Sequence, residues 1–228
     1  MRGQGMGEYC VDIVMCIDGT GSMAPIINEV KNNAMSFYQK LLDAMEESGK
    51  RVSELRVKVI VFRDYICDTE PMVESEFFTL PEQNTAFRDF VMGIEACGGG
   101  DGPENALEAV AAALRSPWTT AGKRRRHVVL VFSDAPALAL GERADCPGYP
   151  RDLPKSIAEL GAWWENTDQM FTGTYSARAG RLIAFVPNAS PWTEITTWNR
   201  YWPAFSPAGL GLEDVDIQAV IDLLVGSF

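Results

Sequence analysis

The chain has 228 residues, a hydrophobic fraction of 46% and a formal net charge of −11 at pH 7. This length and composition fit one globular domain, so we expect a single domain over residues 1–228. The negative charge argues against nucleic acid as a partner, because phosphate binding needs clustered Lys and Arg side chains.

Targeting signals and cysteine usage narrow the class of protein further. No apolar run approaches the length of a membrane span, and residues 1–9 lack the apolar stretch of a secretion signal. The five cysteines are scattered and include no C-x-x-C pair. We therefore expect a reduced cytoplasmic protein without disulfides, which does not bind to membranes.

The first half of the chain contains alternating strand and helix patterns. Residues 10–17 (CVDIVMCI) are mostly apolar, which is typical of a parallel strand buried on both faces. Residues 24–48 have apolar side chains at helical spacing and end at a glycine. The next expected elements are a strand over 55–62, an edge strand near 77–80 and two helices over 85–96 and 103–114.

The second half repeats this alternation. Residues 127–132 (HVVLVF) form the clearest strand pattern, which stops at Ser133-Asp134 and leads into a loop over 135–151. The remaining expected elements are a helix over 153–165, a strand over 181–186, a short helix over 191–199, a short strand over 201–205 and a helix over 215–224. This order predicts an α/β fold with a doubly wound, mostly parallel open sheet, flanked by helices on both faces.

Polar side chains of one chemical kind follow two of these strands and lie between two of the helices. They are found in Asp18-Gly19-Thr20-Gly21-Ser22, in the glycine-rich segment 98–104 and at Asp134. Ligands of open α/β sheets bind beyond the carboxyl ends of the strands. Carboxylate and hydroxyl oxygens without histidine or thiol are the ligands of a hard divalent cation. A carboxylate and two hydroxyls would leave that cation room for water and for a carboxylate from a partner protein.

These residues resemble the metal-ion-dependent adhesion site (MIDAS) of von Willebrand factor A (vWA) domains. The resemblance extends from about Tyr9 to Leu224 and implies a Rossmann-like vWA fold. It implies that Asp18, Thr20, Ser22 and Asp134 hold Mg²⁺, with Mn²⁺ or Ca²⁺ as alternatives. It also implies a module for metal-dependent protein–protein interaction rather than an enzyme. Cytoplasmic A domains work beside ATPases, kinases or phosphatases, so the expected partner belongs to such a system and supplies a carboxylate.

The middle loop departs from the commonest form of this family. Many members have a threonine there, whereas residues 98–104 read GGGDGPE. This is similar to the D-x-P-E form of integrin β-subunit domains and of alpha-kinase-like A domains, which implies Asp101 first and Glu104 second as further metal ligands. The segment Phe62-Arg63-Asp64-Tyr65 also resembles that subgroup. Its Arg63 and Asp64 are expected to support the metal ligands or to form a salt bridge at the same rim.

Other interpretations of the same residues remain open at this point. Asp18, Thr20 and Ser22 could cap a helix after a glycine turn, and Asp101 and Glu104 are equally favourable in a turn and a first helical turn without metal. The alternative function is a haloacid dehalogenase-like or other metal-dependent phosphohydrolase, but such phosphatases have a second Asp where Thr20 stands. The single histidine, His127, lies at a strand start and is expected to be structural, and no phosphate-binding G-x-x-x-x-G-K-[ST] loop is present.

Overall fold

The structure, a computed structural model, describes residues 8–99, 102–209, 212–213 and 215–228. Seven strands form one sheet in the order β3-β2-β1-β5-β6-β7, and β4 pairs with another part of β2. The strands are β1 (Glu8–Asp18), β2 (Arg51–Phe62), β3 (Met72–Glu74), β4 (Phe78–Leu80), β5 (Arg124–Phe132), β6 (Gly180–Pro187) and β7 (Tyr201–Ser206). All strand pairs are parallel except those of β2 with β3 and β4.

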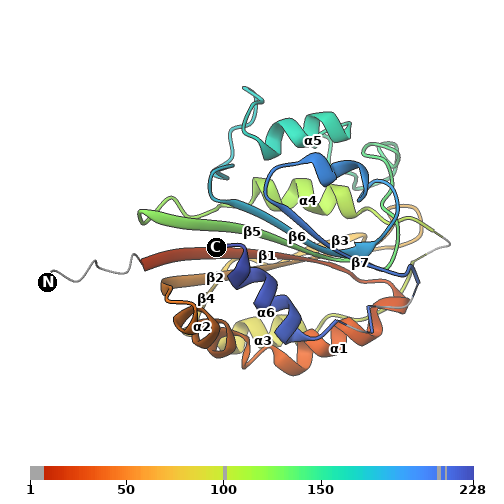
Figure 1. Cartoon of the computed structure of the whole chain (residues 1–228). Helices are drawn as coiled ribbons and strands as arrows, with labels where there is room; N and C mark the ends of the chain where they lie inside the picture. The colour runs from red at the N-terminus through yellow and green to blue at the C-terminus, as the bar shows by residue number, and fades with distance from the viewer. Residues whose placement is uncertain (1–7, 100–101, 210–211, 214) are drawn as a thin grey trace, which may run out of the picture.

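Helices cover both faces of this sheet (Figure 1). On one face lie α4 (Ala106–Arg115) and α5 (Ile157–Trp164). On the other lie α1 (Ala24–Asn33), α2 (Phe37–Glu47), α3 (Asn84–Met92) and α6 (Ile217–Gly226). Two short 3₁₀ helices, η1 (Gly21–Met23) and η2 (Glu194–Thr197), complete the fold. The predicted doubly wound α/β architecture is confirmed.

The central strands are buried on both faces, which explains why they lack an alternating pattern. Along β1, Ile13 and Met15 pack into the core beneath α1 and α6, while Val14 and Cys16 pack against α4 on the other face. Each such fully buried aliphatic side chain contributes about 1.5–3 kcal/mol. Cys10 and Cys16 are buried within β1, as expected for cysteines that act as small hydrophobic residues.

The largest difference from the expected elements lies in residues 24–48, where two helices replace one. The Asn33 side chain donates to the backbone carbonyl of Glu29 and to its carboxylate, 3.0 and 2.9 Å away. That carbonyl is the helical partner of Asn33 N–H, so the side chain shares it at the last residue of α1. The helix then gives way to tighter turns, and Ala34 N–H donates to the Lys31 carbonyl, three residues back. Ser36 N–H turns back to the Asn33 carbonyl, and α2 starts at Phe37.

Other elements also differ from the expected ones, and the helix expected over 153–165 begins only at Ile157. The expected elements missed β3, a three-residue edge strand with no alternating pattern to read. The expected helix over 85–96 ends earlier, at Met92 before Gly93. The helix expected from residue 103 starts at Ala106, because Glu104 backbone atoms bond instead to Pro136 and Leu138.

A buried polar cluster lies near the amino ends of the central strands. Asp12, fully buried in β1, accepts two hydrogen bonds from Arg56 (2.8 and 2.6 Å) and one from Thr119 N–H (2.6 Å). His127, also fully buried, has Nε2 3.0 Å from the Thr119 carbonyl, and its Nδ1 accepts from Ser176 N–H. This arrangement uses the neutral imidazole with its proton on Nε2. The expectation that His127 is structural agrees with these contacts.

We predict that His127 makes the stability of the domain depend on pH. Burial lowers the pKa of His127 from 6.5 to about 4, so between these values the unfolded chain binds a proton that the folded chain does not. The stabilisation is present above pH 6.5 and is lost as the pH falls. Relative to its value at pH 7.5, the free energy of unfolding at pH 5 should fall by about 2 kcal/mol more for the wild type than for His127→Gln.

Urea denaturation of both proteins at the two pH values measures this difference. Both proteins contain the same carboxyl groups, and His127 is the only histidine in the chain. The difference between their pH dependences therefore reports the protonation of the His127 imidazole. Equal pH dependence of the two proteins would contradict the prediction.

Candidate metal site

The predicted site residues gather at the switch point of the sheet, between the parallel strands β1 and β5, where the strand order reverses. Asp18 is the last residue of β1, Asp134 follows β5, and Glu104 precedes α4. A hollow of about 440 Å³ opens at this carboxyl edge and is lined by Thr20, Gly21, Ser22, Gly98, Gly99, Gly102, Glu104, Asp134, Ala135, Pro136, Ala208 and Gly209. Asp101 lies outside the described residues.

Hydrogen bonds join the residues of the D-x-T-x-S segment to the residues after β5. Asp18 Oδ1 accepts from the Thr20 hydroxyl at 2.6 Å and from Thr20 N–H at 3.0 Å. Asp18 Oδ2 accepts from the Ser133 hydroxyl at 2.8 Å. The Ser22 hydroxyl donates to Asp134 Oδ1 at 3.0 Å and lies 3.5 Å from the Thr20 hydroxyl. Residues 112 positions apart in the chain therefore form one polar cluster.

These side chains are not used to cap a helix. Thr20 precedes η1 and Met23 precedes α1, and neither cap has a side-chain hydrogen bond. The hydroxyls of Thr20 and Ser22 instead bond to carboxylates across the cluster. These side chains therefore do not form the capped turn that the sequence left open.

Glu104 is placed beside this cluster by its backbone. Its N–H donates to the Pro136 carbonyl at 3.0 Å and its carbonyl accepts from Leu138 N–H at 2.9 Å. Its side chain lines the hollow and is only 4% exposed. The Oε2 atom is buried and has no hydrogen-bond partner among the described residues. A buried carboxylate oxygen without a donor is costly, so this atom points to a missing cation or proton.

The pKa values of two carboxyl groups at this site are raised. Burial raises the pKa of Asp18 to about 6, and the hydrogen bonds that Asp18 accepts oppose this only in part. Burial first, and then the negative charges of Asp18 and other carboxylates, raise the pKa of Glu104 to about 8. No Lys, Arg or His is among the described residues that line the hollow. The described lining therefore holds carboxylates without a cationic side chain, and the nearby charge of Arg143 opposes the raised pKa of Glu104 only in part.

Two glycines allow the loops to approach closely here. A Cβ on Gly19 would lie 2.6 Å from Val61 Cγ1 and 2.9 Å from the Arg63 guanidinium. A Cβ on Gly99 would lie 2.7 Å from Thr20 Cγ2, and its φ of +78° also favours glycine. The glycines of both loops thus let the site residues meet.

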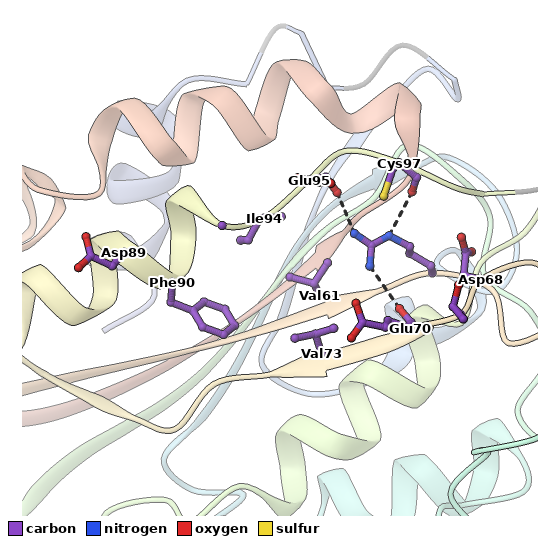
Figure 2. Close-up of a pocket in the computed structure, with 12 residues that line it drawn as sticks. Val61, Asp68, Glu70, Val73, Asp89, Phe90, Ile94, Glu95 and Cys97 are labelled. Atoms are coloured by element: carbon purple, nitrogen blue, oxygen red, sulfur yellow. Dashed lines mark hydrogen bonds between the residues drawn. The ribbon is translucent and has the colours of Figure 1, made fainter.

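Arg63 holds these loops together through backbone carbonyls. Its guanidinium donates to the carbonyls of Gly19 (3.2 Å), Cys97 (3.1 Å), Glu95 (2.8 Å) and Glu70 (3.3 Å). Dashed lines in Figure 2 mark the bonds that reach Glu70, Glu95 and Cys97. The role expected for Arg63 was support of the metal ligands or a salt bridge, and its guanidinium hydrogen bonds go instead to backbone carbonyls of these loops.

Asp64 forms the expected salt bridge, but with a residue that the sequence did not single out. Its two carboxylate oxygens accept from Arg143 at 2.9 and 3.0 Å. Arg143 belongs to the loop after β5, so this pair fixes that loop beside the end of β2. The hydrogen bonds to Arg143 hold the pKa of Asp64 below its usual value, although burial opposes them.

Two other residues near the site were also missed by sequence reasoning. Ser133 was visible as the neighbour of Asp134, but only the structure shows that it donates to Asp18. Gly209 N–H donates to the Asp134 carbonyl at 2.8 Å, which places the turn after β7 at the rim. No sequence signal could have indicated this contact, because it depends on how two distant loops cross.

These features define an open α/β protein with an oxygen-lined hollow at the switch point of its sheet. A model of the von Willebrand factor A domain family matches residues 12–142, more than half of the chain. The chain therefore belongs to the von Willebrand factor A domain family.

Individual relatives are distant in sequence. The chain is 26% identical over 148 residues to alpha-protein kinase vwkA of Dictyostelium discoideum, covering 65% of this chain and 22% of that protein. The pilus adhesin SpaC of Lactobacillus rhamnosus GG in its open conformation is similar in structure, with a TM-score of 0.55 and 9% identity over 97% of this chain and 30% of that chain. A von Willebrand factor type A structure from Catenulispora acidiphila gives a TM-score of 0.51 and 11% identity over 96% of this chain and 43% of that chain.

The structures show the shared fold, and the chain spans less than half of each of these proteins. Within the residues that the structure describes, no helix has the length and apolar character needed to cross a membrane.

We predict that Arg63→Lys loosens the glycine-rich loop without unfolding the domain. Lysine keeps the positive charge but cannot reproduce the planar fork that reaches several carbonyls. A carbonyl left without its donor costs about 1–3 kcal/mol, so amide exchange in residues 94–99 should speed up by at least about tenfold. Hydrogen exchange followed by mass spectrometry measures this.

Arg88→Lys is the matched control, because Arg88 is exposed and pairs only with neighbouring Asp89. It should leave exchange in residues 94–99 unchanged. If Arg63→Lys also left it unchanged, the carbonyl contacts would not be what holds this loop.

Proposed function

We propose that this domain binds a divalent cation, Mg²⁺ first and Mn²⁺ or Ca²⁺ as alternatives, and uses it to bind a protein partner. The observation that carries the proposal is the buried cluster of Asp18, Glu104 and Asp134 with the hydroxyls of Thr20 and Ser22. Its candidate metal ligands are all oxygen atoms, which suits a hard cation. When bound, the cation supplies positive charge and an open coordination position for an outside oxygen ligand.

The fit of the residues to a cation rests on the chemistry already described. Glu104 has an unpartnered buried oxygen, Asp18 and Glu104 have raised pKa values, and the described lining holds no cationic side chain. A cation bound here would supply positive charge to Asp18 and Glu104, although the described residues contain no ready-made group of three acidic, histidine or cysteine side chains for a metal. Asp101, which lies outside the described residues, belongs with Glu104 to the proposed D-x-P-E form of this site as its second acidic member.

The proposed partner supplies a carboxylate to the cation. The D. discoideum relative carries the name of an alpha-protein kinase, which supports the proposal of a partner or companion domain in a kinase, ATPase or phosphatase system. The proposed role is interaction rather than catalysis. A cytoplasmic setting is part of this proposal.

The phosphohydrolase alternative has less support from the site. Thr20 stands where a haloacid dehalogenase-like phosphatase would have its second Asp, and its hydroxyl donates to Asp18 at 2.6 Å. Nothing in the described cluster replaces the missing general acid at that position. Hydrolysis of p-nitrophenyl phosphate with Mg²⁺ present tests this alternative, and we expect none above the buffer rate.

Isothermal titration of metal-free protein with Mg²⁺ and Mn²⁺ tests the proposed cation site. We expect one saturable site in the wild type, and binding at least about tenfold weaker in Asp18→Asn and Asp134→Asn, which is about 1.4 kcal/mol. The isosteric changes remove charge and keep shape. Asp145→Asn, an exposed residue of the neighbouring loop, is the matched control and should bind like the wild type.

The result that would contradict the cation site is equally definite. If wild type shows no saturable binding at millimolar Mg²⁺ and Mn²⁺, or if Asp18→Asn and Asp134→Asn bind like Asp145→Asn, the cluster is not the site. Circular dichroism of each variant establishes that it remains folded.

The partner carboxylate is tested separately with two short peptides. One carries a single Asp among Gly, Ser and Ala residues, and the other carries Asn at that position. We expect the Asp peptide to bind Mg²⁺-loaded protein, measured by fluorescence anisotropy, and to lose binding in EDTA. Binding of the Asp peptide that survives EDTA, or equal binding of the Asn peptide, would contradict a carboxylate–metal contact.

A further inference from the structure

A second hollow lies on the other side of the glycine-rich loop from the candidate metal site. Its volume is about 790 Å³, and it opens between edge strand β3, the end of α3 and residues 93–97 (Figure 2). Cys97 belongs to this hollow, while the following Gly98 and Gly99 line the metal site. The two hollows share one loop as a wall but contain different chemistry. We refer to the second hollow as the edge groove.

The floor of the edge groove is apolar. Val61 and Val73 are paired in register on neighbouring strands, so their side chains point to the same face of the sheet. Phe90 of α3 and Ile94 close this floor from the helix side (Figure 2). Val73 and Phe90 are only half-buried although they pack against the main core. Covering them would bury apolar surface that the domain leaves in contact with water.

The rim of the edge groove is acidic. Asp68, Glu70, Asp89 and Glu95 surround the apolar floor, as Figure 2 shows. Glu70 and Glu95 are exposed, and no ion pair with either is present among the residues that the structure describes. Asp89 is paired with Arg88. The rim therefore keeps negative charge that a partner could neutralise.

One cationic side chain among the described residues, that of Arg63, also lines this groove. Arg63 is only 7% exposed, and its guanidinium donates to carbonyls of Glu70, Glu95 and Cys97. It is thus engaged with the backbone, not with the carboxylates of the rim. Those carboxylates lie farther out, where a docking segment would meet them first.

We propose that the edge groove is a docking site for a partner segment that places one large apolar side chain on the floor and lysine or arginine side chains on the rim. Charge complementarity selects this occupant. An acidic segment would be repelled by the rim, and a purely apolar one would leave Glu70 and Glu95 without compensation. This docking site does not use the cation, so it is independent of the proposed metal function.

Fluorescence anisotropy with labelled peptides in EDTA tests the edge groove by itself. The probes are a Lys-Lys-Leu-Lys-Lys peptide, its version with Ser in place of Leu, and its version with Glu in place of every Lys. We expect the Leu peptide to bind, the Ser peptide to bind at least about fivefold more weakly, and the Glu peptide not to bind. Affinity should fall with added salt, because the rim contacts are screened.

Matched double variants separate the groove from the general negative charge of the domain. Glu70→Lys with Glu95→Lys reverses the rim, and Glu46→Lys with Glu47→Lys makes the same charge change on the exposed end of α2. We expect at least about tenfold weaker binding of the Leu peptide in the first variant and less than twofold in the second. All four positions are exposed, so both variants should fold.

Three outcomes would overturn the proposal. If both variants bind the Leu peptide equally weakly, the peptide is attracted only by the net charge of the domain. If the Leu and Ser peptides bind equally well, the apolar floor does not contribute to binding. The third concerns a second copy of this chain as the occupant. A wild-type dimer in analytical ultracentrifugation that the rim variant abolishes would assign the groove to self-association instead.

Discussion

Burying several carboxylates together is the constraint on which the carboxyl edge of this sheet depends. Asp18, Glu104 and Asp134 are almost completely removed from water. Glu104 and Asp134 line one hollow, and Asp18 bonds to Thr20 at its edge. Transfer of a charged group from water is costly unless it is paired, so a cluster of like charge requires protons or a cation. The hydroxyls of Thr20, Ser22 and Ser133 lessen this cost by donating hydrogen bonds, but they bring no charge.

The two arginines closest to this cluster are committed elsewhere. Arg63 is held by backbone carbonyls, and Arg143 is paired with Asp64. Both therefore shape the loops that surround the carboxylates, and the charge of Arg143 also lowers the pKa of Glu104 in part. These contacts order the loops around the proposed cation site.

The same loops connect the candidate metal site to the edge groove. Residues 93–97 form a wall of the groove, and Gly98 and Gly99 form a wall of the metal site. Arg63 contacts the loop from the groove side, and Cys97 N–H donates to the Gly19 carbonyl at 3.0 Å on the site side. A partner that occupied both hollows would meet negative charge at the rim of the edge groove. At the metal site it would meet a positive charge only when a cation is bound there. The two hollows would then recognise partner groups of opposite charge.

The sequence by itself determined the fold class and predicted which residues form the candidate site. Buried strands at 10–17 and 127–132 and helical spacing between them predicted the order of elements, because side-chain periodicity follows from backbone geometry. The spacing of Asp18, Thr20 and Ser22, with Asp134 after a later strand, brought these residues to one edge because parallel strands end at the same side. Glu104 was predicted with them, as the second choice after Asp101.

Only the tertiary structure decided which contacts these residues make. At the break between α1 and α2, the N–H groups of Ala34 and Ser36 each donate three residues back, to Lys31 and Asn33, and end the α-helical pattern. The pairing of Asp64 with Arg143, the carbonyl contacts of Arg63 and the crossing of Gly209 over Asp134 join segments far apart in the chain. Local patterns carry no information about such pairings, because these contacts form only when loops of irregular shape pack against one another in three dimensions.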